Sequence, residues 1–129
     1  MLTDPIADAL SNMKNQERAG NLSCVVRPAS KVIGSILKIF KDYGYLETFE
    51  FIQDGKGGNF NIQLSGKLND CGVIRPRYPT SKLSFEKFEK RFLPASGFGV
   101  LVVTTSQGIM THEDAKSRGI GGRLLCYAY

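Results

Sequence analysis

A run of four apolar residues that leads directly into three hydroxyl side chains constrains this chain most. Residues 100–103 read Val-Leu-Val-Val, and Thr104, Thr105 and Ser106 follow them. A short, continuous apolar run bounded by turn residues is typical of a strand that is buried on both faces. Gly108 then interrupts the pattern. The sequence therefore predicts a loop of hydroxyl groups at the end of a rigid strand, where it suits phosphates, 2′-hydroxyls and base edges.

The first half of the chain alternates helical and strand patterns. Pro5 at a first helical position and Ser30 as an N-cap predict two helix starts, and glycines predict both helix ends. A glycine-rich turn between two alternating apolar runs predicts a β-hairpin. This order predicts a small sandwich with both helices on one face of a sheet. The expected elements are a helix over 5–20, a strand over 22–27, a helix over 31–43 and half-buried hairpin strands at 49–51 and 60–64.

The second half is expected to be mostly β with short helices. Thr111 and Asp114 resemble a capping box, which predicts a brief helix after the hydroxyl loop. No Ser/Gly/Pro-rich linker separates the halves, and the boundary is expected near 65–70. The sequence thus predicts an α+β fold of two small lobes packed together, one over 1–65 and one over 66–129. The expected elements of the second lobe are strands over 71–74, 98–103 and 123–129 and helices over 84–93 and 112–118.

The charge balance favours an anionic partner. Lysine and arginine number 17 against 12 aspartate and glutamate residues, a formal net charge of +5, and basic proteins of this kind attract nucleic acids or membrane surfaces. A signal peptide is not expected because Asp4 and Pro5 come too early, and no apolar run approaches the roughly 20 residues of a membrane helix. We therefore expect a cytoplasmic protein without membrane contact.

The cysteines and the single histidine do not predict a metal site, a cofactor site or a catalytic site. Cys24, Cys71 and Cys126 are widely spaced and form no Cys-x-x-Cys pair, so buried free thiols are expected. Ser106 and His112 could form a hydrolytic pair across a turn, but the strained elbow that activates such a serine is missing. No catalytic residues are assigned, and a small Ser/His hydrolase stays the weakest alternative.

Two segments at opposite ends resemble one known family. Residues 4–15 read Asp-Pro-Ile-Ala-Asp-Ala-Leu-Ser-Asn-Met-Lys-Asn, and residues 104–111 read Thr-Thr-Ser-Gln-Gly-Ile-Met-Thr. Glu-Asp-Ala at 113–115 and Gly-Ile-Gly-Gly at 119–122 complete the second motif. Together they resemble the opening helix and the C-terminal signature of the small-subunit ribosomal protein eight family. The resemblance covers essentially the whole chain, and the segment 66–97 looks like the archaeal and cytosolic eukaryotic branch.

The resemblance implies a non-enzymatic constituent of the small ribosomal subunit. Members of the family bind the central domain of the ribosomal RNA, and a free RNA-binding translational regulator is the alternative that it leaves open. The implied partners are this RNA and neighbouring ribosomal proteins, with the chain a monomer in the particle. Carried over, the loop contact comprises Thr104, Thr105, Ser106, Gly108 and Met110, and the N-terminal contact comprises Asp4, Asn12, Lys14, Asn15, Ser30 and Lys31. Arg118, Gly122 and Arg123 are further candidates beside the loop.

One departure and one compositional point shape this expectation. Many bacterial relatives carry an acid where this chain has Arg123, so an arginine–phosphate contact replaces any carboxylate contact there. Exposed aromatic side chains that could stack on unpaired bases are expected to be few. The sequence therefore predicts readout of folded, largely duplex RNA by shape and minor-groove contacts.

Overall fold

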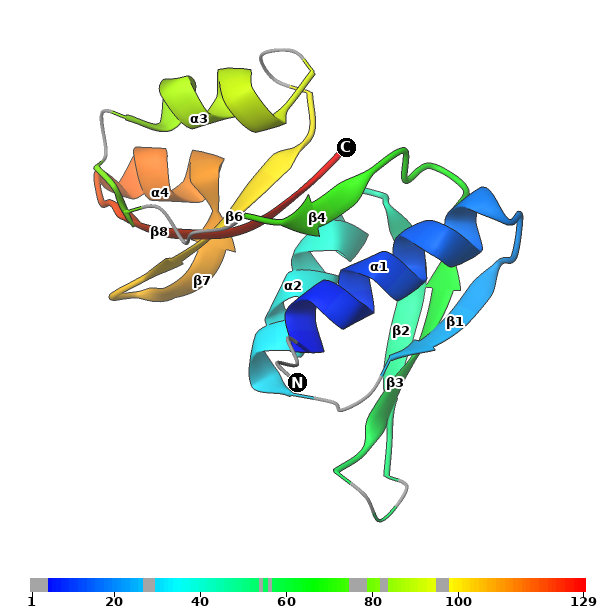
Figure 1. Cartoon of the computed structure of the whole chain (residues 1–129). Coiled ribbons are helices and arrows are strands. Elements are labelled where there is room, and N and C mark those ends of the chain that lie inside the picture. The colour runs from blue at the N-terminus through cyan, green and yellow to red at the C-terminus, as the bar shows by residue number, and fades with distance from the viewer. Residues whose placement is uncertain are drawn as a thin grey trace, which may run out of the picture. The chain divides into compact units, whose positions relative to one another are not determined.

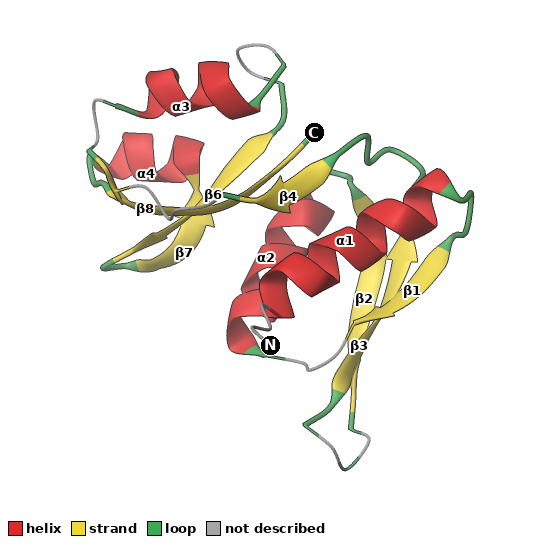
Figure 2. Cartoon of the chain, viewed as in Figure 1, coloured by secondary structure: helices red, strands yellow, loops and turns green. Residues whose placement is uncertain are grey.

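The computed structural model describes residues 5–26, 30–53, 55, 57–74, 79–81, 84–94 and 98–129. Their Cα positions divide the chain into two compact units, Met1–Cys71 and Gly72–Tyr129, and the boundary predicted from the sequence lies near residues 65–70. Each unit combines helices with one antiparallel sheet (Figures 1 and 2). The α+β class predicted from the sequence is thus confirmed.

The first unit is a three-stranded sheet covered by two helices. The strand order is β1-β3-β2, and both pairings are antiparallel. Both helices lie on the same face of this sheet (Figure 1), as the sequence predicts. The elements in chain order are α1 (Pro5–Arg18), β1 (Ser23–Val26), α2 (Lys31–Asp42), β2 (Leu46–Ile52) and β3 (Asn59–Leu64).

Capping and an apolar stripe explain α2. The hydroxyl of Ser30 accepts a hydrogen bond from the Ile33 amide at 3.2 Å, which satisfies one amide of the first turn. The buried residues of α2 are Ile33, Ile36, Leu37 and Phe40, and those of β3 that share the core are Phe60, Ile62 and Leu64.

The hairpin of β2 and β3 differs from the prediction at its outer end. We expected Phe51 on a half-buried face, but its side chain is 55% exposed, and Ile52 beside it is 39% exposed. The hairpin reaches past the start of α2 in Figure 1. The alternating pattern therefore identified the strand correctly, but the length of the covering helix decides which of its apolar residues are buried.

The second unit is built on a sheet with the strand order β4-β8-β6-β7, and β5 pairs with β8. Helices α3 and α4 cover one face of the sheet (Figure 1), where Phe85, Phe88 and Ala115 share a hydrophobic core with Leu101, Val103 and Leu124. The elements are β4 (Cys71–Val73), β5 (Pro79–Thr80), α3 (Phe85–Phe92), β6 (Val100–Thr105), β7 (Gly108–Thr111), α4 (His112–Arg118) and β8 (Gly122–Ala128).

The structure corrects two predictions in this unit. The predicted hydroxyl loop is shorter than expected: β6 extends through Thr105, only Ser106 and Gln107 form a turn, and Gly108 begins an additional strand that was not predicted. Four residues are too few for a strand period to stand out. The terminal strand β8, expected to bury one face, buries residues on both faces: Leu124, Leu125 and Cys126 are all buried.

Candidate RNA-binding surface

The hydroxyl run lies at the tip of a tight β-hairpin. Strands β6 and β7 pair with Thr105 opposite Gly108, and Ser106 and Gln107 form the turn between them. The Thr105 hydroxyl donates to the Gly108 carbonyl at 2.8 Å and accepts from the Gln107 amide at 3.1 Å. Gly108 adopts a φ of 111°, a conformation that L side chains rarely reach. The turn is therefore fixed by a side chain, and Ser106 and Gln107 are exposed at its tip.

Helix α4 brings an arginine to this tip. The Thr111 hydroxyl caps the helix by accepting from the Asp114 amide at 3.0 Å, so the capping box predicted from the sequence is present in part. At the other end of the helix, Nη1 of Arg118 donates to the Gln107 side-chain oxygen at 2.9 Å. The guanidinium is thus held beside the exposed turn, and a fixed guanidinium suits phosphate recognition.

Strand β8 adds a second arginine on the other side of β6. Arg123 is exposed and lies opposite Thr104 in the β6–β8 pairing. A Cβ atom at Gly122 would lie 2.2 Å from the Thr104 carbonyl oxygen, so only glycine fits this position. We call the combined surface the hairpin surface; it comprises Thr104, Thr105, Ser106, Gln107, Gly108, Arg118, Gly122 and Arg123.

One residue predicted for this site lies elsewhere. Met110 is only 6% exposed, and its side chain belongs to the hydrophobic core of the second unit. Its position on β7 places its side chain toward the core, whereas the tip of the hairpin is the part that reaches solvent. Conversely, Gln107 was not among the residues predicted for the site, although its side chain positions Arg118.

Among the side chains predicted to contact RNA in the first unit, some are exposed and others already form a hydrogen bond or an ion pair within the protein. Asn15 and Lys31 are exposed. The Asn12 amide donates to the Val25 carbonyl at 2.8 Å, and Nζ of Lys14 lies 2.8 Å from the Asp70 carboxylate. Ser30 caps α2, and Asp4 lies outside the described residues. Asn12 and Ser30 therefore support the local structure in addition to any contact with RNA.

His112 is not arranged to activate a serine. It is 2% exposed, its Nδ1 accepts from the Leu101 amide at 3.1 Å, and its Nε2 lies 3.4 Å from Oε1 of Glu89. The same carboxylate contacts the ammonium of Lys116. Burial lowers the pKa of His112 below its ordinary value, although Glu89 opposes this change. Both ring nitrogens thus face the protein interior, and the arrangement does not support the hydrolase alternative.

The cysteines are buried free thiols, as predicted. Burial raises the pKa of Cys24 to about 11 and that of Cys71 to about 12, so neither thiol is reactive near neutral pH. Among the residues that the structure describes, no group of three His, Cys, Asp or Glu side chains could hold a metal ion. In the same part of the chain, no helix is long and apolar enough to cross a membrane.

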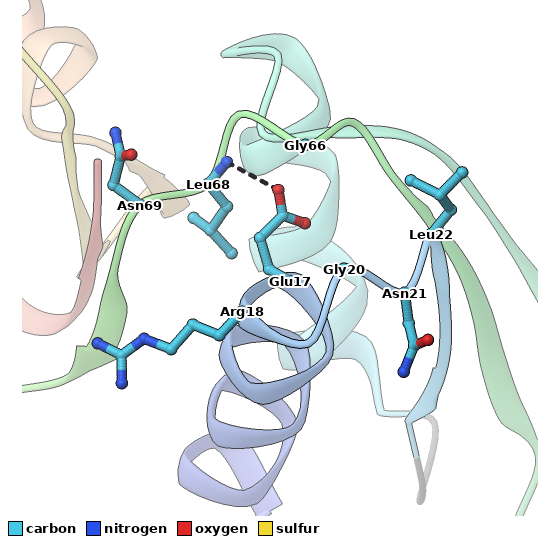
Figure 3. A pocket seen from close by; sticks show the side chains of 8 residues that line it. All are labelled: Glu17, Arg18, Gly20, Asn21, Leu22, Gly66, Leu68 and Asn69. Atoms are coloured by element: carbon cyan, nitrogen blue, oxygen red, sulfur yellow. Dashed lines mark hydrogen bonds between the residues drawn. The ribbon is translucent and has the colours of Figure 1, made fainter.

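A pocket of about 290 Å³ lies at the end of α1, beside a hydrogen bond that connects the helix to a later segment (Figure 3). Oε1 of Glu17 accepts from the Leu68 amide at 3.3 Å and thereby connects α1 to the segment that follows β3. The remaining walls come from the end of α1, the turn that follows it and the segment after β3. The residues that line the pocket are Glu17, Arg18, Gly20, Asn21, Leu22, Gly66, Leu68 and Asn69.

The fold and the hairpin surface define a class of protein. A basic α+β chain that presents hydroxyls and a glycine-shaped turn at the tip of a hairpin, with arginines from α4 and β8 beside it, has the features of a structural RNA-binding protein. A comparison with known families identifies it further: the model of the family Ribosomal protein S8 matches residues 4–129, nearly the whole chain. The chain therefore belongs to the ribosomal protein S8 family. It is a non-enzymatic protein of the small subunit in the cytoplasmic ribosome, where it binds ribosomal RNA among other ribosomal proteins.

Proposed function

We propose that this chain helps to assemble and stabilise the small ribosomal subunit by holding the central domain of its RNA on the hairpin surface. The observation that carries this proposal is the hydrogen bond from Arg118 to Gln107, which fixes a cation beside the exposed Ser106. Hydroxyl and arginine side chains together serve the 2′-hydroxyls and phosphates of a folded RNA.

The first unit supplies a second contact in this proposal. Exposed Asn15 on α1 and exposed Lys31 at the start of α2 are the side chains best placed to reach RNA, because Asn12 and Ser30 also serve the fold. Two contacts on one chain connect separate segments of RNA, which is the physical basis for a role in assembly. We also propose, from the segment 66–97, that the chain belongs to the archaeal and cytosolic eukaryotic branch of the family.

Replacement of Ser106 tests the hairpin surface. We expect Ser106→Ala to weaken binding to a transcript of the central domain by about 1–2 kcal/mol, the usual worth of a hydrogen bond to a polar or charged group. Filter binding at one salt concentration measures the affinity, and circular dichroism verifies the fold. Ser23→Ala, which changes an exposed serine of β1 in the other unit, is the matched control and should bind as the wild type does.

Two results would contradict the proposed function. If Ser106→Ala and the wild type bound the transcript with equal affinity, the hairpin surface would not be the specific contact. Sedimentation of the wild-type chain apart from small subunits in a cell extract would contradict the proposed place in the particle.

A further inference from the structure

The first unit has an apolar pocket that the hairpin surface does not include. Its volume is about 290 Å³, and Ser30, Lys31, Gly34, Phe51 and Phe60 line it. Its lining residues come from the start of α2 and from strands β2 and β3. In Figure 1 the β2–β3 hairpin reaches past the start of α2. The pocket is open to solvent in the part of the chain that the structure describes.

Two glycines shape this pocket and hold its aromatic wall. A Cβ atom at Gly34 would lie 3.2 Å from the Phe60 ring, so the missing side chain lets that ring approach α2. A Cβ atom at Gly58 would lie 2.4 Å from the Phe51 ring, which therefore lies against the Gly58 backbone. The Phe51 and Phe60 rings meet edge to face, with centroids 6.0 Å apart. Phe51 is thus held by contacts on two sides before any ligand arrives.

The exposed part of Phe51 forms an apolar platform beside a positive charge. Its side chain is 55% exposed and borders the apolar pocket. An exposed aromatic ring at the edge of an apolar pocket suits contact with a ligand. Lys31 is exposed at the same pocket, and the first turn of α2 contains no acidic residue. A ligand that fits this surface has a flat apolar face and a negative charge close to it.

We propose that this pocket binds one unpaired nucleotide of the ribosomal RNA, with its base stacked on Phe51 and its phosphate beside Lys31. The inference rests on the ribosomal RNA-binding function and deepens it by adding a stacking contact to the phosphate and minor-groove contacts. Every base has a π-face, so a platform of this kind accepts different bases. The Ser30 hydroxyl is occupied by the cap of α2, so it forms part of the pocket wall. Lys31 is then the residue of the pocket that can contact the phosphate.

A single tryptophan can report the stacking directly. The chain contains no tryptophan, so Phe51→Trp introduces a unique fluorophore into the full-length protein. We expect its fluorescence to be quenched on titration with a central-domain transcript, and to change little with a fully paired RNA duplex of equal length. Phe98→Trp is the matched control, because Phe98 is 49% exposed in the other unit. Equal quenching at both positions, or quenching by the duplex, would overturn the proposal.

Affinity measurements separate stacking from simple apolar contact. Phe51→Ala should weaken binding to the same transcript by about 5- to 150-fold, the range observed when a stacking side chain is removed. Phe51→Leu keeps apolar area without a ring and should bind nearly as weakly, whereas Phe51→Tyr should bind like the wild type. Thermal unfolding of each variant verifies the fold.

Two results would overturn the inference without touching the proposed function. If Phe51→Ala bound the transcript as tightly as the wild type while Ser106→Ala did not, the hairpin surface would stand and the Phe51 pocket would not bind RNA. If Phe51→Ala bound the transcript normally but joined small subunits poorly, the occupant of the pocket would be a neighbouring protein.

Discussion

Thr105 shows how one side chain sets the geometry of the hairpin surface. Its hydroxyl donates to the Gly108 carbonyl and accepts from the Gln107 amide, so it closes the turn on both sides. Gln107 in turn holds Arg118. Thr105 therefore acts through its neighbours and orders the groups that face the RNA.

Replacement of Thr105 by valine removes both of these hydrogen bonds while it keeps the β-branched shape. We expect Thr105→Val to lower the free energy of unfolding by about 1–2 kcal/mol and to weaken RNA binding, because the turn residues lose their fixed positions. Thr105→Ser keeps the hydroxyl and should retain both properties. Urea unfolding and filter binding check the pair, and equal binding by Thr105→Val and the wild type would contradict this positioning role.

Gly122 illustrates a steric requirement between neighbouring strands. Its missing side chain allows β8 to approach the Thr104 carbonyl, which a Cβ atom would meet at 2.2 Å. Gly122→Ala should therefore lower the free energy of unfolding by about 1–3 kcal/mol, as overpacking usually does. It should also weaken RNA binding, since Thr104 and Arg123 flank this contact. Thermal unfolding together with filter binding measures both effects, and an unchanged melting temperature would be evidence against the close contact.

At the scale of elements, a buried polar cluster joins α3, α4 and β6. His112 of α4 accepts from the Leu101 amide of β6 and lies 3.4 Å from Glu89 of α3. Lys116, one turn further along α4, contacts the same carboxylate. The two helices are thereby connected to each other and to the strand that ends in the hairpin surface.

This cluster makes the stability of the second unit depend on pH. The pKa of buried His112 is lowered from its ordinary value of 6.5, so below about pH 6.5 the unfolded chain takes up more protons than the folded one. The free energy of unfolding should therefore fall as the pH drops from 6.5 toward the folded-state pKa. Urea unfolding at about pH 7.5 and about pH 5.5 measures this slope. His112→Asn should flatten it, and an equal slope in both proteins would exclude His112 as the cause.

At the scale of the whole molecule, the net charge of +5 belongs to the second unit, which has 9 lysine and arginine against 4 aspartate and glutamate residues, whereas the first unit has 8 of each and is neutral. Lys31 and Arg123 are exposed cations of the first and second units. Lys14 differs from them, because its ammonium lies 2.8 Å from the Asp70 carboxylate. The contribution of each cation to RNA binding therefore depends on its surroundings as well as its charge.

The salt dependence of binding tests this distribution. Arg123→Ala should reduce the slope of log K against log salt by about 0.9, the value for one phosphate contact on a duplex, and Lys31→Ala by about 0.7, the value for one phosphate of an unpaired strand. Lys14→Ala should reduce it less, since Asp70 already offsets part of the Lys14 charge. Lys90→Ala changes an exposed lysine of α3 outside the proposed contacts and serves as the control. A slope reduction at Lys90 equal to that at Arg123 would indicate nonspecific attraction.

The sequence by itself determined most helices and strands of this protein, their caps, the basic charge and the hydroxyl run. These features depend on residues within about one helical turn of each other. Thr111 and Asp114 predict the start of α4, and Ser30 predicts the start of α2, because a cap and its partner lie three residues apart. The resemblance to the ribosomal family was readable for the same reason, since its motifs are continuous in the sequence.

Only the tertiary structure decided which of these side chains face solvent and which neighbours they meet. Strand β7 forms because it pairs with β6, and that pairing directs Met110 into the core. Phe51 is exposed because the β2–β3 hairpin extends beyond the helix that covers the rest of it. Arg118 contacts Gln107 because the end of α4 lies close to the turn between β6 and β7. Burial and cross-strand pairing depend on contacts between residues far apart in the chain, and such contacts have no local signature in the sequence.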